Sequence, residues 1–153
     1  MIAVDHRDES GITCCEGTLE REKSVSVPNA IEVVTLFVDD ITQAKTFYES
    51  VFEPEVVYED EVSCVLDFEG TAVNLLQISQ APELVVPVPV APAAAGARVL
   101  LTIKVADVDA TCAVLRDRGV RLLNGPIDRP WGRRTAAFAD PSGHVWEVAQ
   151  ELG

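Results

Sequence analysis

The sequence predicts an α+β fold built from two successive βαβββ modules. In each half of the chain, a β-branched and apolar run of strand length is followed by a segment with helical spacing and then by three shorter apolar stretches. The halves also correspond by position, because Leu36–Asp40 matches Ile103–Asp107 at an offset of 67 residues. Duplicated units that cannot bury their own apolar faces have to pack against each other. We therefore expect both modules to form one compact domain.

The first module is expected over residues 30–80. Its leading strand, 31–38, ends at a pair of aspartates, of which Asp40 can cap a helix that stops before Pro54. The apolar face of this helix consists of Ile41, Ala44, Tyr48, Val51 and Phe52. Three shorter strands are expected at 56–58, 62–68 and 71–78, with Gly70 in the hairpin turn between the last two.

A connector and the second module complete the expected domain. Residues 81–96 carry four prolines among alanines, which predicts an extended connector that is neither helix nor central strand. In the second module, 97–152, the expected elements are a strand at 99–105, a helix between Asp107 and Gly119, and strands at 120–122, 135–139 and 144–150.

A second match fixes the difference in length between the modules. The step from Gly70 to Asn74 recurs from Gly143 to Glu147 at an offset of 73 residues. The second module is therefore six residues longer than the first. We place the additional residues in a loop at 126–134.

The acidic composition argues against nucleic acid and anionic membranes as partners. The chain has 12 Lys and Arg against 25 Asp and Glu, a formal net charge of -13, whereas nucleic-acid binding depends on cations that neutralise phosphates. No apolar run approaches the roughly 20 residues needed to cross a bilayer. Solubility is the simplest reason for the acidic balance, and attraction of a cationic ligand is the alternative.

The N-terminal segment and the cysteines indicate a cytoplasmic protein. Residues 1–24 are rich in acids and have no sustained apolar period, so we expect a flexible acidic tail ahead of a single domain over 25–153. The tail lacks the basic start and apolar stretch of a signal peptide. The four cysteines form no CxxC motif and are expected to be reduced thiols, with Cys64 and Cys112 filling core space and Cys14 and Cys15 in the tail.

Three local sequences make residues 30–152 resemble the glyoxalase, bleomycin-resistance and extradiol-dioxygenase superfamily, also called the vicinal oxygen chelate superfamily. They are the strand end Phe37-Val38-Asp39-Asp40, the helical pair Phe47-Tyr48, and the closing Asp140-Pro141-Ser142-Gly143-His144-Val145-Trp146-Glu147. The resemblance implies that the modules form an incompletely closed, eight-stranded mixed barrel around a small-molecule cavity. It also implies a homodimer, since relatives commonly pair their modules within or across chains.

The resemblance further places metal ligands on the first and fourth strand of each module, at positions that are Val33, Asn74, Leu100 and Glu147 here. A divalent ion needs several imidazole or carboxylate donors, and only Glu147 supplies a strong one. Glu32 adjoins Val33, but successive strand residues point to opposite faces, so Glu32 does not replace the missing ligand. We expect neither a metal ion nor another cofactor.

Strand alternation predicts which side chains line the cavity. If Val33 faces inward, Thr35 and Phe37 lie on the same side, and the second module presents Leu100, Thr102 and Lys104 at the corresponding positions. An apolar wall with a few polar groups is typical of an organic-ligand site. A packed barrel interior is the alternative.

Glu147 has three interpretations that the sequence leaves open. A carboxylate in an apolar barrel needs a partner, so Lys104 or an arginine could hold Glu147 in a structural ion pair. Glu147 could bind the ligand instead. It could also act as a general base, provided that burial raised its pKa and a substrate proton lay within reach.

The loop around Trp131 is expected to form a lip of the cavity. Trp131 offers a rigid apolar plate, and Arg134 could clamp a carboxylate or carbonyl, although solvated side chains on a surface hairpin are the alternative. His144 has no evident aspartate or cysteine partner in the sequence, so we interpret it as a turn residue and not as a base. Trp146 should face away from Glu147 and pack under a helix.

The sequence and the resemblance together predict a metal-independent protein that binds a small organic molecule and sequesters an antibiotic or metabolite. The candidate ligand-binding side chains are Thr35, Phe37, Asn74, Thr102, Trp131, Arg134 and Glu147. The alternative is an enzyme of the same fold, a lyase, isomerase or dioxygenase relative that uses Glu147 with or without a divalent metal. A subunit whose fold serves only assembly is the third possibility.

Overall fold

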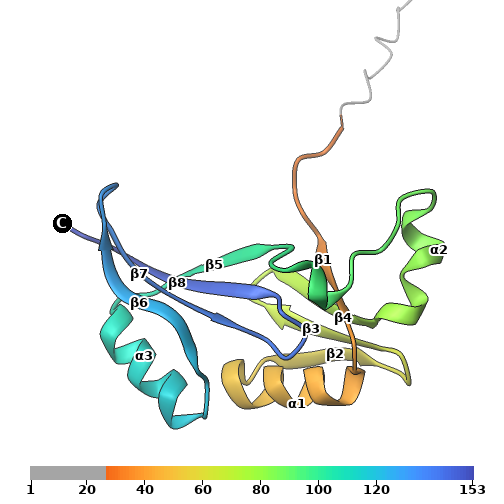
Figure 1. The fold of residues 1–153 in the computed structure, drawn as a ribbon, viewed down its shortest axis with the longest axis horizontal. Coiled ribbons are helices and arrows are strands. Elements are labelled where there is room, and N and C mark those ends of the chain that lie inside the picture. The colour runs from red at the N-terminus through yellow and green to blue at the C-terminus, as the bar shows by residue number, and fades with distance from the viewer. Residues whose placement is uncertain (1–26) are drawn as a thin grey trace, which may run out of the picture.

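The computed structural model describes residues 27–153, which form two four-stranded mixed sheets with two longer helices on the same side of them (Figure 1). The strand orders are β1-β4-β3-β2 and β5-β8-β7-β6, and the sheets are not joined by a strand pair. The predicted α+β fold of two βαβββ modules is therefore confirmed, with the sheets left unclosed. The expected tail, with Cys14 and Cys15, lies outside the described residues.

The first module follows the predicted order closely. Its elements are β1 (Val33–Val38), α1 (Ile41–Phe52), β2 (Glu55–Glu59), β3 (Ser63–Phe68) and β4 (Thr71–Gln77). Asp40 caps α1 by accepting a hydrogen bond from the Gln43 amide at 2.9 Å. The helix ends at Glu53, which adopts a left-handed conformation with φ of 51°.

The second module repeats this arrangement. Its elements are β5 (Leu100–Lys104), α3 (Val108–Asp117), β6 (Leu122–Arg129), β7 (Arg133–Ala139) and β8 (Val145–Glu151). Asp107 caps α3 through the Ala110 amide at 2.9 Å, as Asp40 caps α1. The 67-residue offset between the capping aspartates thus reflects equivalent positions in the fold.

Two glutamines also occupy equivalent positions, which the sequence analysis did not single out. Gln77 Oε1 accepts from the Ile41 amide at 3.0 Å, and Gln150 Oε1 accepts from the Val108 amide at 2.9 Å. Both amides belong to first helical residues, whose N–H groups have no partner within the helix. Each module therefore ties the start of its helix to the end of its last strand.

The connector differs from the prediction of a wholly extended segment. It contains a short helix, α2 (Pro82–Val85), and a turn of 3-10 helix at Ala93–Ala95, and another such turn at Ile78–Gln80 leads into it from β4. Pro82 stands at the start of α2, where the missing N–H of proline costs no helical hydrogen bond. Proline therefore excludes helix from the middle of such a segment but permits a single turn that begins with it.

The six additional residues of the second module extend a hairpin, where the prediction was a short strand at 120–122 followed by a loop. β6 and β7 pair from Leu122 to Arg129, with register shifts around Asn124. Gly125 lies in the shifted region with φ of 84°, and a Cβ atom there would come within 2.4 Å of the Thr135 carbonyl oxygen. Only glycine fits this approach of the two strands.

One hydrophobic core joins the two modules. Alternate residues of β1 and β4 face α1, and Trp146 of β8 packs edge-on to Tyr48 of α1 with ring centroids 5.9 Å apart. The prediction that Trp146 packs under a helix is confirmed, as is burial of Cys64 and Cys112, both free thiols. No helix in the described part of the chain is long and apolar enough to span a bilayer.

Candidate functional site: an acid-rimmed groove between the modules

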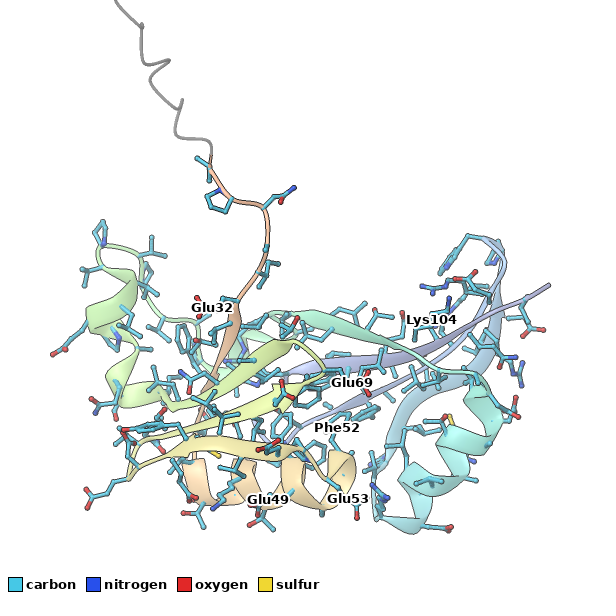
Figure 2. All side chains as sticks on the ribbon, turned by 180° about the vertical axis from the view of Figure 1, so that it is seen from behind. Glu32, Glu49, Phe52, Glu53, Glu69 and Lys104 are labelled. Atoms are coloured by element: carbon cyan, nitrogen blue, oxygen red, sulfur yellow. The ribbon has the colours of Figure 1, made fainter. Side chains whose placement is uncertain are left out.

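A groove of about 640 Å³ opens between the two modules. One wall is β5, an edge strand of the second sheet, and the other consists of the β3–β4 turn and the end of α1. In Figure 2, Lys104 marks the β5 wall, and Glu69, Phe52 and Glu53 mark the facing elements. The groove exists only because the modules lie side by side.

Three aromatic rings from different elements give the groove its apolar lining. Phe52 of α1 lies 5.2 Å from Phe68 of β3 and 4.9 Å from Trp146 of β8, measured between ring centroids. Phe68 also stacks on Trp146 at 5.4 Å. Because the three rings pack against each other at distances typical of aromatic pairs, the groove presents a continuous aromatic surface.

The rim carries four carboxylates and one ammonium group. The four acids are Glu53, Glu55, Asp67 and Glu69, and the base is Lys104, all of them exposed. Glu53 is neutralised by Arg118, whose Nη2 lies 3.0 Å from Glu53 Oε2. Within residues 27–153, the other three carboxylates make no ion pair.

Two of these carboxylates face each other across a strand pair. Glu55 of β2 and Asp67 of β3 are directly opposite in the antiparallel register. Like charges in this position destabilise a sheet. Their placement therefore concentrates negative charge at the rim of the groove at some cost to the stability of the sheet.

The polar side chains predicted on the inward face form a matching pair in each module. Thr35 lies beside Asn74 in the parallel register of β1 and β4, and Thr102 lies beside Glu147 in that of β5 and β8. Glu147 Oε1 accepts a hydrogen bond from Thr102 Oγ1 at 3.1 Å. The structure gives Glu147 this hydroxyl partner, and no ion pair with Lys104 is found among the described residues.

The structure does not bring all the predicted ligand-binding residues together. Thr102 lines the groove, whereas Thr35 and Phe37 line a separate cavity of about 300 Å³. Neither cavity is lined by Asn74 or Glu147.

Trp131 and Arg134 lie on the β6–β7 hairpin and do not line the groove. Trp131 is 67% exposed at the tip of the hairpin, with the Arg129 guanidinium 5.9 Å from its ring centroid. The Arg134 guanidinium binds Asp109 of α3 at 2.6 Å and Asp128 at 2.7 Å. The bond from Arg134 lowers the pKa of Asp109, and the two bonds together occupy the donors of Arg134 that a ligand would need.

His144 has a partner, contrary to the expectation from the sequence. Its Nδ1 lies 2.8 Å from Asp140 Oδ2, and both side chains are buried. Asp140 also accepts from the Tyr48 hydroxyl at 2.7 Å, and that hydroxyl accepts from Trp146 Nε1 at 3.0 Å. The sequence analysis overlooked this partner because Asp140 is only four positions before His144, and we interpreted both residues as parts of a turn.

The electrostatics of this buried network follow from its hydrogen bonds. Burial alone would raise the pKa of Asp140, but bonds from His144 and Tyr48 outweigh burial and hold the pKa of this carboxyl below its ordinary value. Burial and the neighbouring Asp140 charge raise the pKa of Tyr48. The network therefore contains an ionised carboxylate and a neutral phenol.

Comparison with known proteins agrees with this architecture. Residues 30–148 match the model of the Glyoxalase/Bleomycin resistance protein/Dioxygenase superfamily. The chain belongs to this superfamily. It is also 32% identical over 123 residues to the uncharacterized protein YraH of Bacillus subtilis (strain 168). The aligned region covers 78% of this chain and 96% of YraH.

Solved structures of the superfamily share the fold. A glyoxalase/bleomycin resistance protein/dioxygenase from Nocardioides superimposes with a TM-score of 0.73 at 23% identity, covering 85% of this chain and 87% of its own. Lactoylglutathione lyase from Agrobacterium tumefaciens gives a TM-score of 0.66 at 21% identity, with 82% and 96% covered. At these identities the similarity establishes the fold alone.

The residues of this superfamily member do not fit a metal site of the expected kind. Residues 27–153 contain no group of three or more His, Cys, Asp or Glu side chains that could hold an ion. At the four positions implied by the resemblance, Val33 and Leu100 have no donor atoms and Asn74 offers only an amide. Glu147 would be a single strong ligand.

Apart from Thr102, sequence analysis did not assign to a ligand site the residues that line the groove. Phe52 was assigned only to the helix face, and Phe68 and Glu69 only to a strand end and a turn. Acidic residues beside aromatic ones at 52–55 and 67–69 were the available signal. The signal was weak because the two segments meet only in the folded protein.

Proposed function

We propose that this protein binds a small organic cation in the groove and sequesters it without a metal ion. The observation that carries the proposal is the set of three carboxylates, Glu55, Asp67 and Glu69, which surround an aromatic lining and make no ion pair within residues 27–153. Membership of a superfamily that includes bleomycin-resistance proteins supports a binding role. The net charge of -13 would also attract a cation over a distance.

The chemistry of the groove suits a ligand with an apolar body and a positive group. Aromatic faces attract cations within about 6 Å of the ring centroid and provide apolar contact at the same time. A cation between Glu55 and Asp67 would remove the repulsion between these opposed carboxylates. The contacts of the cation with these two carboxylates, which the free protein lacks, would then contribute to the binding free energy.

A calorimetric titration with cationic and neutral probes tests this proposal. Benzyltrimethylammonium, choline and a cationic glycopeptide are compared with benzyl alcohol, which retains the ring but has no charge. We expect at least one cationic probe to bind and its affinity to fall as salt is added, since exposed charges are screened over about 10 Å at 0.1 M ionic strength. Equal affinity for the neutral probe would contradict the proposal.

Variants of the rim locate the binding site. In a triple variant with Glu55→Gln, Asp67→Asn and Glu69→Gln, we expect the affinity for the cation to fall about tenfold or more, equivalent to about 1.4 kcal/mol. The matched control removes three exposed acids elsewhere, with Glu61→Gln, Glu83→Gln and Asp117→Asn. An equal loss in both variants would show that net charge alone attracts the ligand and that the groove is not the site.

Elemental analysis tests the metal-independent part of the proposal. Protein purified without chelators should contain no stoichiometric zinc, nickel, iron or manganese. One tightly bound metal ion per chain would instead favour an enzyme that uses Glu147. The same preparation, assayed for binding before and after chelation, should give the same affinity for the cation.

We also propose a homodimer in the cytoplasm. Val33 of β1 and Leu100 of β5 are 43% and 56% exposed on edge strands, which leaves apolar surface for a second copy. Light scattering after size-exclusion chromatography should give twice the monomer mass of 16.5 kDa. Fractionation of the native cells should recover the protein with soluble cytoplasmic markers.

A further inference from the structure

A second cavity lies between β1 and the proline-rich connector. Its volume is about 300 Å³, and the connector contributes Val85, Val88, Pro89 and Val90 to its wall. Val34 alone is common to the linings of this cavity and the acid-rimmed groove. The two cavities can therefore be tested independently.

The chemistry of this cavity is opposite to that of the groove. Among residues 27–153, no acidic side chain lines it, and the lining residues with polar side chains are Thr35, Arg98 and His144. The remaining lining is aliphatic apart from Phe37. A mostly apolar cavity with a few polar groups is the usual form of a small-molecule site.

Arg98 brings a positive charge to this cavity that no carboxylate neutralises within residues 27–153. Its Nη1 donates to the Ala91 carbonyl at 3.1 Å and its Nη2 donates to the Ser142 carbonyl. Its Nε is buried and has no hydrogen-bond partner among residues 27–153, so it is closed to a ligand in the cavity. Each terminal nitrogen has a second N–H that these carbonyls do not use, and because Arg98 lines the cavity, these are the donors that a ligand oxygen would meet.

His144 contributes a second, oriented polar group. Asp140 accepts from its Nδ1, which fixes the ring and leaves Nε2 without a hydrogen-bond partner among the described residues. His144 is buried and lines this cavity, so a ligand there would contact its ring.

We propose that this cavity binds a small monocarboxylic acid with an apolar body, whose carboxylate is held by Arg98. One guanidinium balances one carboxylate and matches its planar geometry. A phosphate would bring a second negative charge and more polar bulk among the valines and prolines. The apolar body would fill the space against Val88 and Val90, and His144 would contact polar atoms beside the carboxylate.

Titrations with carboxylates and their amides test the proposed site. The probes are isobutyrate, isovalerate, benzoate and phenylacetate, each compared with its neutral amide, and binding is followed by calorimetry and by shifts of the connector resonances in NMR spectra. We expect at least one acid to bind at least tenfold more tightly than its amide. The absence of binding by all four acids would overturn the proposal.

Three variants identify Arg98 as the group that holds the carboxylate. Arg98→Gln should weaken binding of the acid tenfold or more, whereas Arg121→Gln, which removes an exposed arginine outside this cavity, should leave it unchanged. If Arg98→Gln does not fold, Val90→Trp decides the question, because it fills the cavity from the connector and should abolish binding. Retention of full affinity in Val90→Trp would overturn the proposal. Cation binding in the groove should be unaffected by Val90→Trp.

Discussion

The two turns that precede the last strand of each module are equivalent in sequence position but differ in the folded protein. Asp67 near the end of β3 and Gly70 of the β3–β4 turn correspond to Asp140 and Gly143 of the β7–β8 turn at the offset of 73 residues. Asp140 is buried and accepts four hydrogen bonds, two of them from backbone amides. Asp67 is exposed and accepts one long bond of 3.4 Å, from the Gly70 amide.

The contacts across the two module junctions differ in the same way. At the β7–β8 turn, Tyr48 bonds to Asp140 at 2.7 Å, and the Asp39 amide donates to Ser142 Oγ at 3.0 Å, so the modules are linked. At the β3–β4 turn, the corresponding space between Phe68 and β5 is the open groove. A duplicated scaffold can thus use one junction for stability and leave the equivalent junction free for a ligand.

Removal of the Asp140 carboxylate should have the largest effect on stability. Asp140→Asn leaves buried donors around an amide that cannot accept all of their bonds, and we expect a loss of about 3 kcal/mol in the free energy of unfolding. Chemical denaturation measures this loss. The matched control is Asp67→Asn at the equivalent turn, for which we expect a change within about 0.5 kcal/mol. Similar losses in both variants would show that the two turns contribute equally.

The pH dependence of stability should report on the same carboxylate. The pKa of Asp140 is lower in the folded protein than its unfolded value of about 3.9, so the ionised form stabilises the fold above that pH. This stabilisation is lost as the pH falls through the folded pKa. Denaturation measured between about pH 6 and pH 3 should show a smaller decline for Asp140→Asn than for the unmodified protein.

Loss of the Tyr48 hydroxyl should have an intermediate effect. Tyr48→Phe removes a donor to Asp140 and an acceptor for Trp146 Nε1, and we expect a destabilisation of about 1–3 kcal/mol. Tyr58→Phe is the control, because the exposed Tyr58 hydroxyl bonds only to Asp60 among the described residues. Equal midpoints of thermal unfolding for the two variants would contradict a linking role for Tyr48.

The smallest expected effects concern the glutamines that are equivalent in the two modules. Gln77 makes two bonds, from the Ile41 amide and to the Asp39 carbonyl, whereas Gln150 makes one, from the Val108 amide. At about 1 kcal/mol for each bond, Gln77→Ala should cost roughly twice as much as Gln150→Ala. Urea denaturation of both variants measures the ratio. A larger loss for Gln150→Ala would reverse this order.

Much of the fold could be predicted because its signals are local. The capping aspartates, Asp40 and Asp107, precede apolar residues at helical spacing, and both helices begin at the following residue. The connector and the β6–β7 hairpin were predicted less well. Their conformation depends on a proline at a helix start and on a close approach between strands at Gly125, which only the folded chain creates.

The candidate sites were predicted only in part. Strand alternation predicted Thr35 and Thr102 at equivalent positions of the two leading strands, and the structure sets them beside Asn74 and Glu147, a pairing that the sequence analysis did not predict. The side-chain partners were not predictable in this way. Arg134 bonds to Asp109 on another element, and whether such a pair forms depends on how α3 lies on the sheet.

The sequence by itself determined the duplication, the order of elements and the absence of imidazole donors at the four expected ligand positions. These properties depend on residue identity and on periodicity along the chain. The tertiary structure decided which of the two equivalent turns is bonded to the other module and which one borders a groove. It did so because the partners come from distant positions: Tyr48 lies 92 residues from Asp140, and Phe68 meets Trp146 from the other module. Contacts of this range arise from packing, which no local pattern specifies.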